Sequence, residues 1–156
     1  MKKTILILLC VLMCVGMCGC GSIFKKSTYT VALITGSSGI QNHCAAQGAY
    51  EGISAYCQEN GITFKEFTPE TNDEKETASL VEAAVSSGAS LVVFAGPYLG
   101  DDAEKAIKEY PDVNFLLVDC KVKNPTSNVH TISFREDEAG FIAGYVSYIE
   151  GCREYG

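Results

Sequence analysis

The chain contains 156 residues, of which 47% are hydrophobic and 20% are charged, with 15 glycines and only 4 prolines. This composition is that of one folded domain and excludes a disordered or low-complexity chain. The formal net charge is −7, and it becomes −9 without the first twenty residues, which hold two lysines and no acidic residue. Because phosphate-rich surfaces repel an acidic chain, we expect no nucleic-acid partner.

The amino terminus has the pattern of an export signal. Lys2 and Lys3 precede an uncharged segment whose apolar core, from Ile5 to Val15, is too short for a comfortable transmembrane helix. The segment ends in Met17-Cys18-Gly19-Cys20, which resembles the bacterial lipobox. The alternative is an ordinary secretory signal with incidental cysteines.

The lipobox resemblance implies that Cys20 carries diacylglycerol and becomes the new amino terminus after cleavage. Cys14 and Cys18 each follow a bulky methionine and are poorer candidates. We therefore predict a lipoprotein signal peptide at 1–19 and a short tether at 20–28. The acyl chains would hold the protein at the extracytoplasmic face of the cell membrane.

From residue 29 onward, short apolar runs alternate with helical patterns. The expected elements, in chain order, are a strand at 29–35, a helix at 46–60, a strand at 62–67, a helix between 71 and 88, a strand at 91–95, a helix from 101 or 102 to 110, strands at 115–118 and 129–134, and a helix at 136–150. Thr71 and Glu74 have the spacing of a capping box, and Gly88 can end the same helix. The last helix is expected to face inward with Phe141, Ile142, Tyr145, Val146 and Ile149.

Alternating strands and helices predict an α/β fold, a doubly wound parallel sheet with helices on both faces. Ligands of such sheets bind at the carboxyl ends of the strands. Four segments, 36–42, 95–98, 119–122 and 134–135, are therefore expected to meet at one crevice. The loop Gly36-Ser37-Ser38-Gly39 could cradle an anion, but it lacks the P-loop lysine and the third glycine of a dinucleotide fingerprint.

Catalysis and metal binding find little support in the sequence. The crevice segments hold no nucleophile–base pair, and we interpret His43 and Cys44 as loop residues. Cys44, Cys57, Cys120 and Cys152 are too widely spaced for a zinc site, so we expect thiols, although export would allow a pair to oxidise if the fold joined them. We expect no enzyme activity, no cofactor and no metal.

Several segments, in this order and spacing, resemble the basic membrane protein (BMP) family. The quoted matches are Val31–Thr35, Gly39-Ile40, Gln47–Gly52, Val92–Gly96, Tyr110–Phe115, Val118-Asp119, Asn128-Val129 and Phe134–Tyr145. These lipoproteins serve as substrate-binding subunits of ABC importers, and characterised relatives bind purine nucleosides. The resemblance implies a periplasmic-binding-protein type I (flavodoxin-like) N-terminal lobe, a nucleoside-like ligand, and permease and ATPase partners.

The resemblance also implies a set of ligand-binding residues, from which this chain departs in part. The implied positions are Ser38, Gln41, Asn42, Gln47, Gly96 and Asp119. The family's first ligand loop reads Thr-Asp-x-Gly-x-Ile-Asp-Asp-x-Ser-Phe-Asn-Gln, whereas here Gly36 replaces the first Asp and Gln41-Asn42 replace the paired Asp. Cys44-Ala45-Ala46 replaces Ser-Phe-Asn, so the aromatic ring that stacks on the nucleobase is lost.

Family members look roughly twice as long, with a second lobe that closes over the ligand. We therefore expect 29–156 to be an N-terminal lobe without its second lobe, as a fragment, a frameshift product or a lone lobe. The alternatives to solute binding are a truncated or degenerate lobe with little affinity for ligand and, less favoured, an enzyme on a flavodoxin-like fold.

Overall fold

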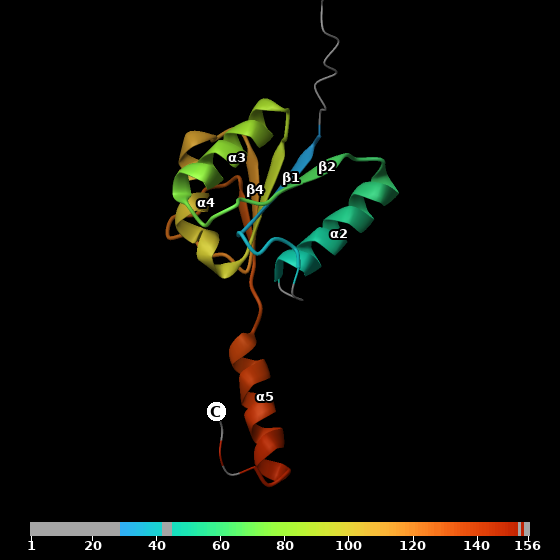
Figure 1. Ribbon diagram of the computed structural model, residues 1–156, viewed down its shortest axis with the longest axis vertical. Helices are drawn as coiled ribbons and strands as arrows, with labels where there is room; N and C mark the ends of the chain where they lie inside the picture. The colour runs from blue at the N-terminus through green and yellow to red at the C-terminus, as the bar shows by residue number, and fades with distance from the viewer. Residues whose placement is uncertain (1–28, 42–44, 153, 155–156) are drawn as a thin grey trace, which may run out of the picture.

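The computed structural model describes residues 29–41, 45–152 and 154 (Figure 1). The predicted signal peptide and tether therefore lie outside the described residues, as do Asn42, His43 and Cys44. No helix in the described part of the chain is long and apolar enough to cross a membrane.

A five-stranded parallel sheet forms the centre of the fold, in the order β2-β1-β3-β4-β5. The strands are β1 (Val31–Thr35), β2 (Phe64–Phe67), β3 (Leu91–Ala95), β4 (Asn114–Val118) and β5 (Val129–Ile132). Residues of β1, β3 and β4 are almost all buried, which explains their continuous apolar sequences. The expected α/β parallel sheet is confirmed, although β2 and β5 are shorter than predicted.

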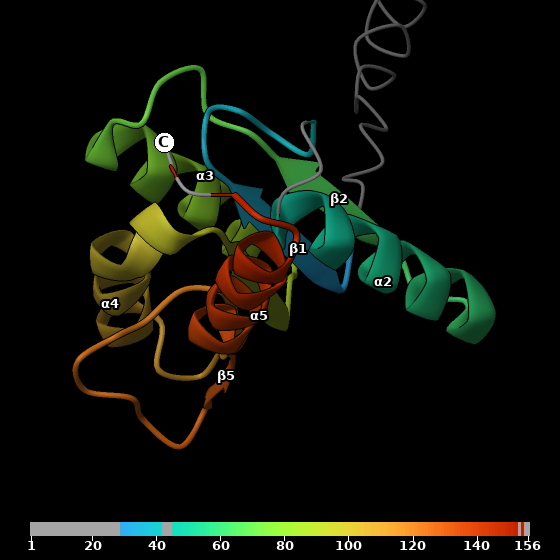
Figure 2. The same ribbon diagram turned by 90° about the horizontal axis from the view of Figure 1, so that it is seen from below.

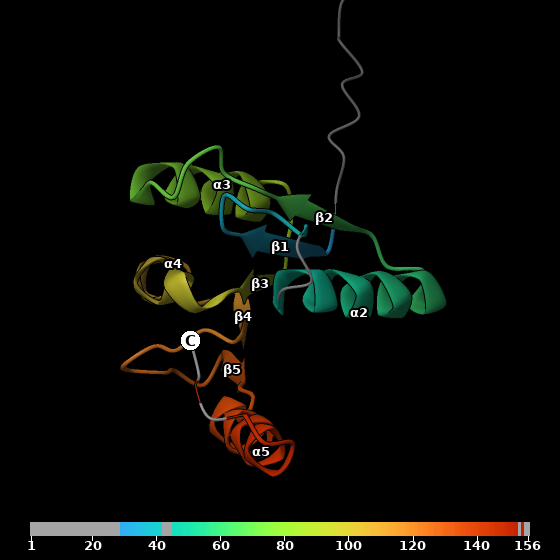
Figure 3. The same ribbon diagram turned by 60° about the horizontal axis from the view of Figure 1, so that its bottom comes forward.

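Three helices cover the two faces of this sheet. Figure 3, which shows the sheet edge-on, places α3 (Glu74–Ser86) and α4 (Gly100–Glu109) on one face and α2 (Ala45–Asn60) on the other. A short 3-10 helix, η1 (Pro97–Leu99), joins β3 to α4. The connections β1–β2, β2–β3 and β3–β4 thus each cross over a face of the sheet, as expected for a doubly wound fold.

The core consists of one apolar layer on each face of the sheet. Alternate strand residues point to opposite faces, so Ile34 and Phe94 pack with α3 and α4, whereas Leu33 and Val93 pack with α2. The rings of Phe94 and Phe115 stack with centroids 6.4 Å apart. Phe94, Phe115, Leu33 and Leu117 are fully buried, which makes the strand centres the main source of stability.

The start of α3 differs from the predicted capping box. Glu76, rather than Glu74, reaches back, and its carboxylate accepts hydrogen bonds from the backbone N–H groups of Glu70 (2.6 Å) and Thr71 (3.0 Å) and from the Thr71 hydroxyl (2.8 Å). These bonds lower the pKa of Glu76. The predicted Thr71–Glu74 pair was wrong because the helix begins later, after Asp73 in an extended conformation. Gly88 follows the helix with φ +102°, as expected for a left-handed terminus.

The last helix, α5 (Glu136–Ile149), contradicts the predicted inward packing. None of its residues is buried, and Phe141 is 75% exposed. Residues 133–135 continue from the end of β5 without turning back, so α5 stands beyond the sheet as a separate rod (Figure 1). The view from below in Figure 2 likewise shows α5 nearest the viewer, in front of the sheet. The helix was predicted correctly, but its inward packing was wrong. The position of α5 depends on the path of residues 133–135, which connect it to β5.

None of the cysteines in the described part of the chain forms a disulfide. Cys57 and Cys120 are buried on opposite faces of the sheet, so they cannot meet, and Cys152 is exposed beyond α5. Burial, with smaller effects from Asp119 and Asp102, raises the pKa of Cys120 to about 11. This thiol is therefore neutral and unreactive at physiological pH.

Candidate functional site

The loops that follow β1, β2 and β3 meet at the carboxyl edge of the sheet and enclose a hollow of about 450 Å³. We call it the β1–β3 hollow, and its lining residues are Gly36, Ser37, Ser38, Asn72, Thr77, Gly96, Tyr98, Leu99 and Asp102. A second hollow of about 450 Å³ adjoins it at Ser37 and Ser38 and is lined further by Gly39, Ile40, Gln41, Glu66 and Thr68. We call it the Gln41 hollow.

Hydrogen bonds between neighbouring loops hold the walls of both hollows. The Asn72 side-chain oxygen accepts a bond of 2.9 Å from the Ser37 N–H, which ties the loop after β2 to the loop after β1. At the ends of the same strands, the buried Thr35 hydroxyl lies 2.9 Å from that of Thr68. The Thr68 hydroxyl in turn donates to Glu66 at 2.8 Å. The chain around Ser37 is therefore positioned by side chains that follow β2.

Gly96 shapes the opposite wall of the β1–β3 hollow. Its φ of +134° is a conformation that side-chain-bearing residues rarely adopt. Its N–H donates to the Val118 carbonyl at 3.0 Å, so the chain stays tied to β4 while it turns away from β3. The turn brings Tyr98 to the rim, where its ring is 94% exposed and free to contact a ligand.

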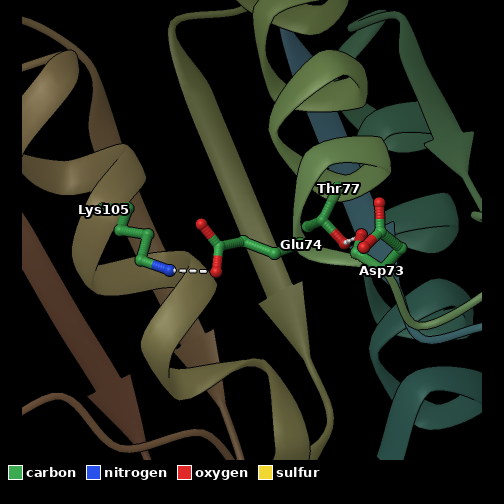
Figure 4. A network of polar contacts seen from close by, with 4 residues as sticks. All are labelled: Asp73, Glu74, Thr77 and Lys105. Atoms are coloured by element: carbon green, nitrogen blue, oxygen red, sulfur yellow. Dashed lines mark hydrogen bonds and ion pairs between the residues drawn. The ribbon is translucent and has the colours of Figure 1, made fainter.

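One acidic side chain, Asp102, lies in the first turn of α4 at the wall of this hollow. Desolvation raises its pKa, and Lys105 acts against this rise. Figure 4 shows the contacts beside it: Lys105 pairs with Glu74, and the Thr77 hydroxyl donates to the Asp73 carbonyl at 3.3 Å. A carboxyl group in this position can accept hydrogen bonds from hydroxyl groups of a neutral ligand.

The structure brings some of the predicted site residues together and separates others. Ser38 and Gly96 line the β1–β3 hollow, and Gln41 lines the adjoining one. Gln47 lies on α2, where its amide donates to Glu51 at 2.9 Å, and it lines neither hollow. Asn42 falls outside the described residues.

Asp119 occupies the end of β4, as predicted, but it lines neither hollow. It adopts φ +54°, in the left-handed region, and its N–H donates to the Ile132 carbonyl at 2.9 Å. The predicted segments 119–122 and 134–135 do not line the two hollows either. The crevice in this structure is therefore narrower than expected, and centres on the loops after β1, β2 and β3.

Sequence reasoning missed Asn72, Thr77 and Asp102 as lining residues, whereas Tyr98 belongs to the segment 95–98 that was expected at the crevice. The sequence did contain a signal for Asn72. The loop that follows the predicted strand at 62–67 must also lie at the carboxyl edge of a parallel sheet, and Asn72 is in that loop. Thr77 is only 1% exposed, and a buried threonine on a helix could not be recognised as part of a crevice without the packing of α3 against α4. In the described chain, no group of three or more His, Cys, Asp or Glu side chains could hold a metal ion.

Gly100 permits the close approach of α4 to the loop after β4, and its replacement gives a stability test. A Cβ at this position would overlap the Lys121 carbonyl oxygen, a backbone atom that cannot move aside cheaply. Gly100→Ala is expected to lower the free energy of unfolding by about 1–3 kcal/mol. Urea unfolding followed by circular dichroism measures the change.

The matched control for this test is Gly52→Ala in α2. No atom lies within 4 Å of the Cβ that this substitution adds, so it is expected to stabilise the helix by about 0.4–1 kcal/mol. Equal effects of the two substitutions would contradict the proposed close approach at Gly100.

The parallel sheet, with its hollows at the carboxyl edge, has a periplasmic-binding-protein-like fold. A solute-binding protein from Aeropyrum pernix K1 superposes with a TM-score of 0.60 at 23% identity, over 80% of this chain and 36% of that one. A putative lipoprotein fragment from Peptoclostridium difficile 630 superposes with a TM-score of 0.59 at 18% identity, over 77% and 97%.

The family follows from the sequence. Residues 29–148 match the Bmp family model, described as ABC transporter substrate-binding protein PnrA-like, and the chain belongs to this family. It is 27% identical over 123 residues to the ABC transporter nucleoside-binding protein BmpA of Lactococcus lactis subsp. cremoris, covering 76% of this chain and 34% of that protein. It is 26% identical over 142 residues to the CD4+ T-cell-stimulating antigen of Listeria monocytogenes, covering 85% and 40%.

The chain thus spans about a third to two fifths of the length of these relatives. The predicted family and fold are confirmed. The family consists of transporter substrate-binding proteins and not of enzymes, which agrees with the sequence analysis.

Proposed function

We propose that this chain is a membrane-tethered solute-binding lipoprotein of an ABC importer, and that its ligand is a nucleoside. The observation that carries the proposal is the pair of polar hollows at the carboxyl edge of a lobe that belongs to the Bmp family. A permease and an ATPase would be its partners, and lipid on Cys20 would hold it at the extracytoplasmic face of the membrane.

The chemistry of the hollows favours a neutral, hydroxyl-rich ligand. Ser38, Asn72 and Asp102 offer hydrogen-bonding groups that suit the hydroxyls of a ribose. Tyr98 exposes a ring at the rim, where a nucleobase could stack. No lysine or arginine is among the described residues that line the two hollows, whereas Asp102 and Glu66 are. A phosphorylated ligand would therefore be repelled, which favours nucleosides over nucleotides.

A second candidate function is a degenerate lobe with little affinity for nucleosides. The residue at one position, Ala45, favours this candidate. Ala45, which stands where the family has its stacking phenylalanine, is in the first turn of α2 and lines an apolar groove instead of either hollow. The lobe also provides one wall of a site that buries about 70–90% of a bound ligand when complete. We accordingly expect the isolated chain to bind nucleosides weakly, with dissociation constants near millimolar.

Titration of residues 21–156 with adenosine, guanosine and inosine, followed by NMR, tests the proposed function. Saturable shifts of the amides at 36–41, 72 and 96–102 are expected, with inositol and glucose as control ligands of another class. Adenosine monophosphate should bind at least tenfold more weakly than adenosine. The absence of saturable shifts in these loops would favour the degenerate lobe, and a low-micromolar dissociation constant would contradict the expected weakness.

Asp119→Asn tests the proposed contribution of this carboxylate to ligand binding. Asparagine also tolerates φ +54°, so the loop after β4 should keep its conformation while the charge is lost. If Asp119 contacts the ligand, affinity should fall by about 1.5–3 kcal/mol, or ten- to 150-fold. The loss is measured by titrating a form of the protein that carries a closing lobe, and an unchanged affinity there would leave Asp119 with only its role in the loop.

A further inference from the structure

The loop between β2 and α3, residues 68–73, lies against the turn that follows β1. This turn, 36–39, is closed by a hydrogen bond of 2.9 Å from its last N–H group to its first carbonyl. Asn72 joins the loop to the turn. Its side-chain oxygen accepts the bond from the Ser37 N–H and would lie 3.4 Å from a Cβ at Gly36. The direction in which the turn projects from the sheet therefore depends on where the Asn72 side chain is held.

The position of this turn affects both hollows of the candidate site. Ser37 and Ser38 are the lining residues that the β1–β3 hollow and the Gln41 hollow have in common. A shift of the turn would therefore change the shape of both hollows and move the Ser38 hydroxyl, which is proposed to bind the ligand. Any residue that holds the turn in place is thus expected to influence affinity.

One carboxylate from the first turn of α3 holds the middle of the loop. The Oε1 atom of Glu76 accepts a hydrogen bond from the Glu70 N–H at 2.6 Å, and its Oε2 atom accepts bonds from the N–H and the hydroxyl of Thr71 at 3.0 Å and 2.8 Å. Hydrogen bonds to an ionised group are stronger than those between neutral groups. Among the residues that the structure describes, no other side chain bonds the backbone of 70–72.

Asn72 lies between two anchored positions of the chain. After it, the Asp73 carbonyl accepts hydrogen bonds from the N–H of Thr77 at 3.1 Å and from its hydroxyl at 3.3 Å, the second of which is drawn in Figure 4. Before it, the chain is fixed by the bonds to Glu76. Loss of the Glu76 carboxylate would free the chain on this side, and the Asn72 amide would then move away from the turn 36–39.

We propose that Glu76 is a positioning residue of the candidate site. Its carboxylate holds Asn72 in place, and Asn72 holds the turn 36–39 in the orientation that binds a ligand. Glu76 itself lines neither hollow, so it acts through Asn72 and not by contact with the ligand. The effect on affinity rests on the proposed function, whereas the effect on the turn is present without any ligand.

Two substitutions and a control separate the links of this chain of contacts. Glu76→Gln keeps the size of the side chain but replaces one acceptor oxygen by an NH₂ group, which cannot accept a bond from the backbone of 70–72. Asn72→Ala removes the contact with Ser37 directly and leaves the Glu76 carboxylate in place. The matched control is Glu82→Gln, which removes the same charge from an exposed position of the same helix.

The first measurement needs no ligand. Amide exchange with water, measured by NMR on residues 21–156, should be about threefold faster or more at Ser37 in Glu76→Gln and in Asn72→Ala, because the hydrogen bond opens more often. The amides of β1 and β3 should keep their rates, which would show that the lobe stays folded. Glu82→Gln should behave like the unaltered chain. An unchanged rate at Ser37 in Glu76→Gln would overturn the proposal.

The second measurement is the affinity for inosine, followed at the amide of Gly96 on the opposite wall of the β1–β3 hollow. Glu76→Gln should weaken binding about fivefold, the effect of one lost hydrogen bond. In the Asn72→Ala background the same substitution should change affinity by less than about twofold, because the residue through which it acts is gone. A merely structural role of Glu76 would weaken binding equally in both backgrounds, and that result would overturn the proposal.

Two other outcomes are also decisive. If inosine fails to bind the unaltered chain, the result counts against the proposed function, while the exchange rate at Ser37 still decides whether Glu76 positions the turn. If Glu76→Gln does not fold, Thr71→Val removes only the hydroxyl bond to Glu76 and should accelerate exchange at Ser37 by a smaller factor. No acceleration in Thr71→Val would then contradict the proposal.

Discussion

Cys20→Ser is expected to move this protein almost completely from the membrane fraction to the soluble fraction. The lipobox resemblance of Met17-Cys18-Gly19-Cys20 makes diacylglycerol on Cys20 the proposed anchor. Two acyl chains hold a protein stably at a bilayer, whereas one chain holds it only marginally, and the predicted tether at 20–28 adds only two lysines. Fractionation and labelling with a fatty acid measure the effect.

Cys18→Ser is the matched control, because Cys18 lies two residues away in the same segment but follows a bulky methionine. It should leave both membrane attachment and labelling unchanged. Continued labelling of the Cys20→Ser variant would show that the lipid is elsewhere or that the lipobox resemblance is misleading.

Phe94→Ala is expected to cost the largest share of the folding stability of the lobe. The side chain is fully buried at the centre of β3 and stacks on Phe115 between the sheet and the α3–α4 layer. Removing a buried aromatic ring costs about 3–5 kcal/mol, because a cavity remains in a tightly packed core. Total stabilities of domains are about 5–15 kcal/mol, so the variant should unfold at much lower urea concentration.

Tyr98→Ala is the control for this substitution, since it also removes an aromatic ring but from a side chain that is 94% exposed. Its effect on the free energy of unfolding should stay within about 0.5 kcal/mol. A loss below about 1 kcal/mol for Phe94→Ala would contradict the central place assigned to β3. The same Tyr98 variant is expected to weaken nucleoside binding if its ring stacks on the base.

Local patterns in the sequence were sufficient for most of the secondary structure and for the fold class. The continuous apolar runs at 91–95 and 115–118 can be buried only in strands that are covered on both faces, and the structure places them at β3 and β4. The apolar positions Ala46, Ala49, Tyr50, Ile53 and Cys57 correctly predicted the side of α2 that faces the core. These predictions succeed because burial imposes a period of two or 3.6 residues on the sequence itself.

The site was only partly predictable. The rule that ligands bind at the carboxyl edge led to Ser38, Gln41 and Gly96, which do line hollows there. Asn72 was missed although it follows the predicted strand at 62–67, and Thr77 could not be included because its contribution depends on α3 packing against α4. Nor could the rule place Gln47 on α2 outside both hollows. Distances between loops arise from strand order and helix packing, which no single segment encodes.

The sequence by itself thus determined the parallel α/β lobe, the family, the export signal pattern and the apolar character of the last helix. Only the tertiary structure decided where that helix lies, which strand-end loops form the hollows, and that Cys57 and Cys120 face opposite sides of the sheet. The physical reason is the range of the interactions involved. The periodicity of apolar residues indicates which side chains favour burial. The surface against which they are buried depends on backbone turns as short as residues 133–135.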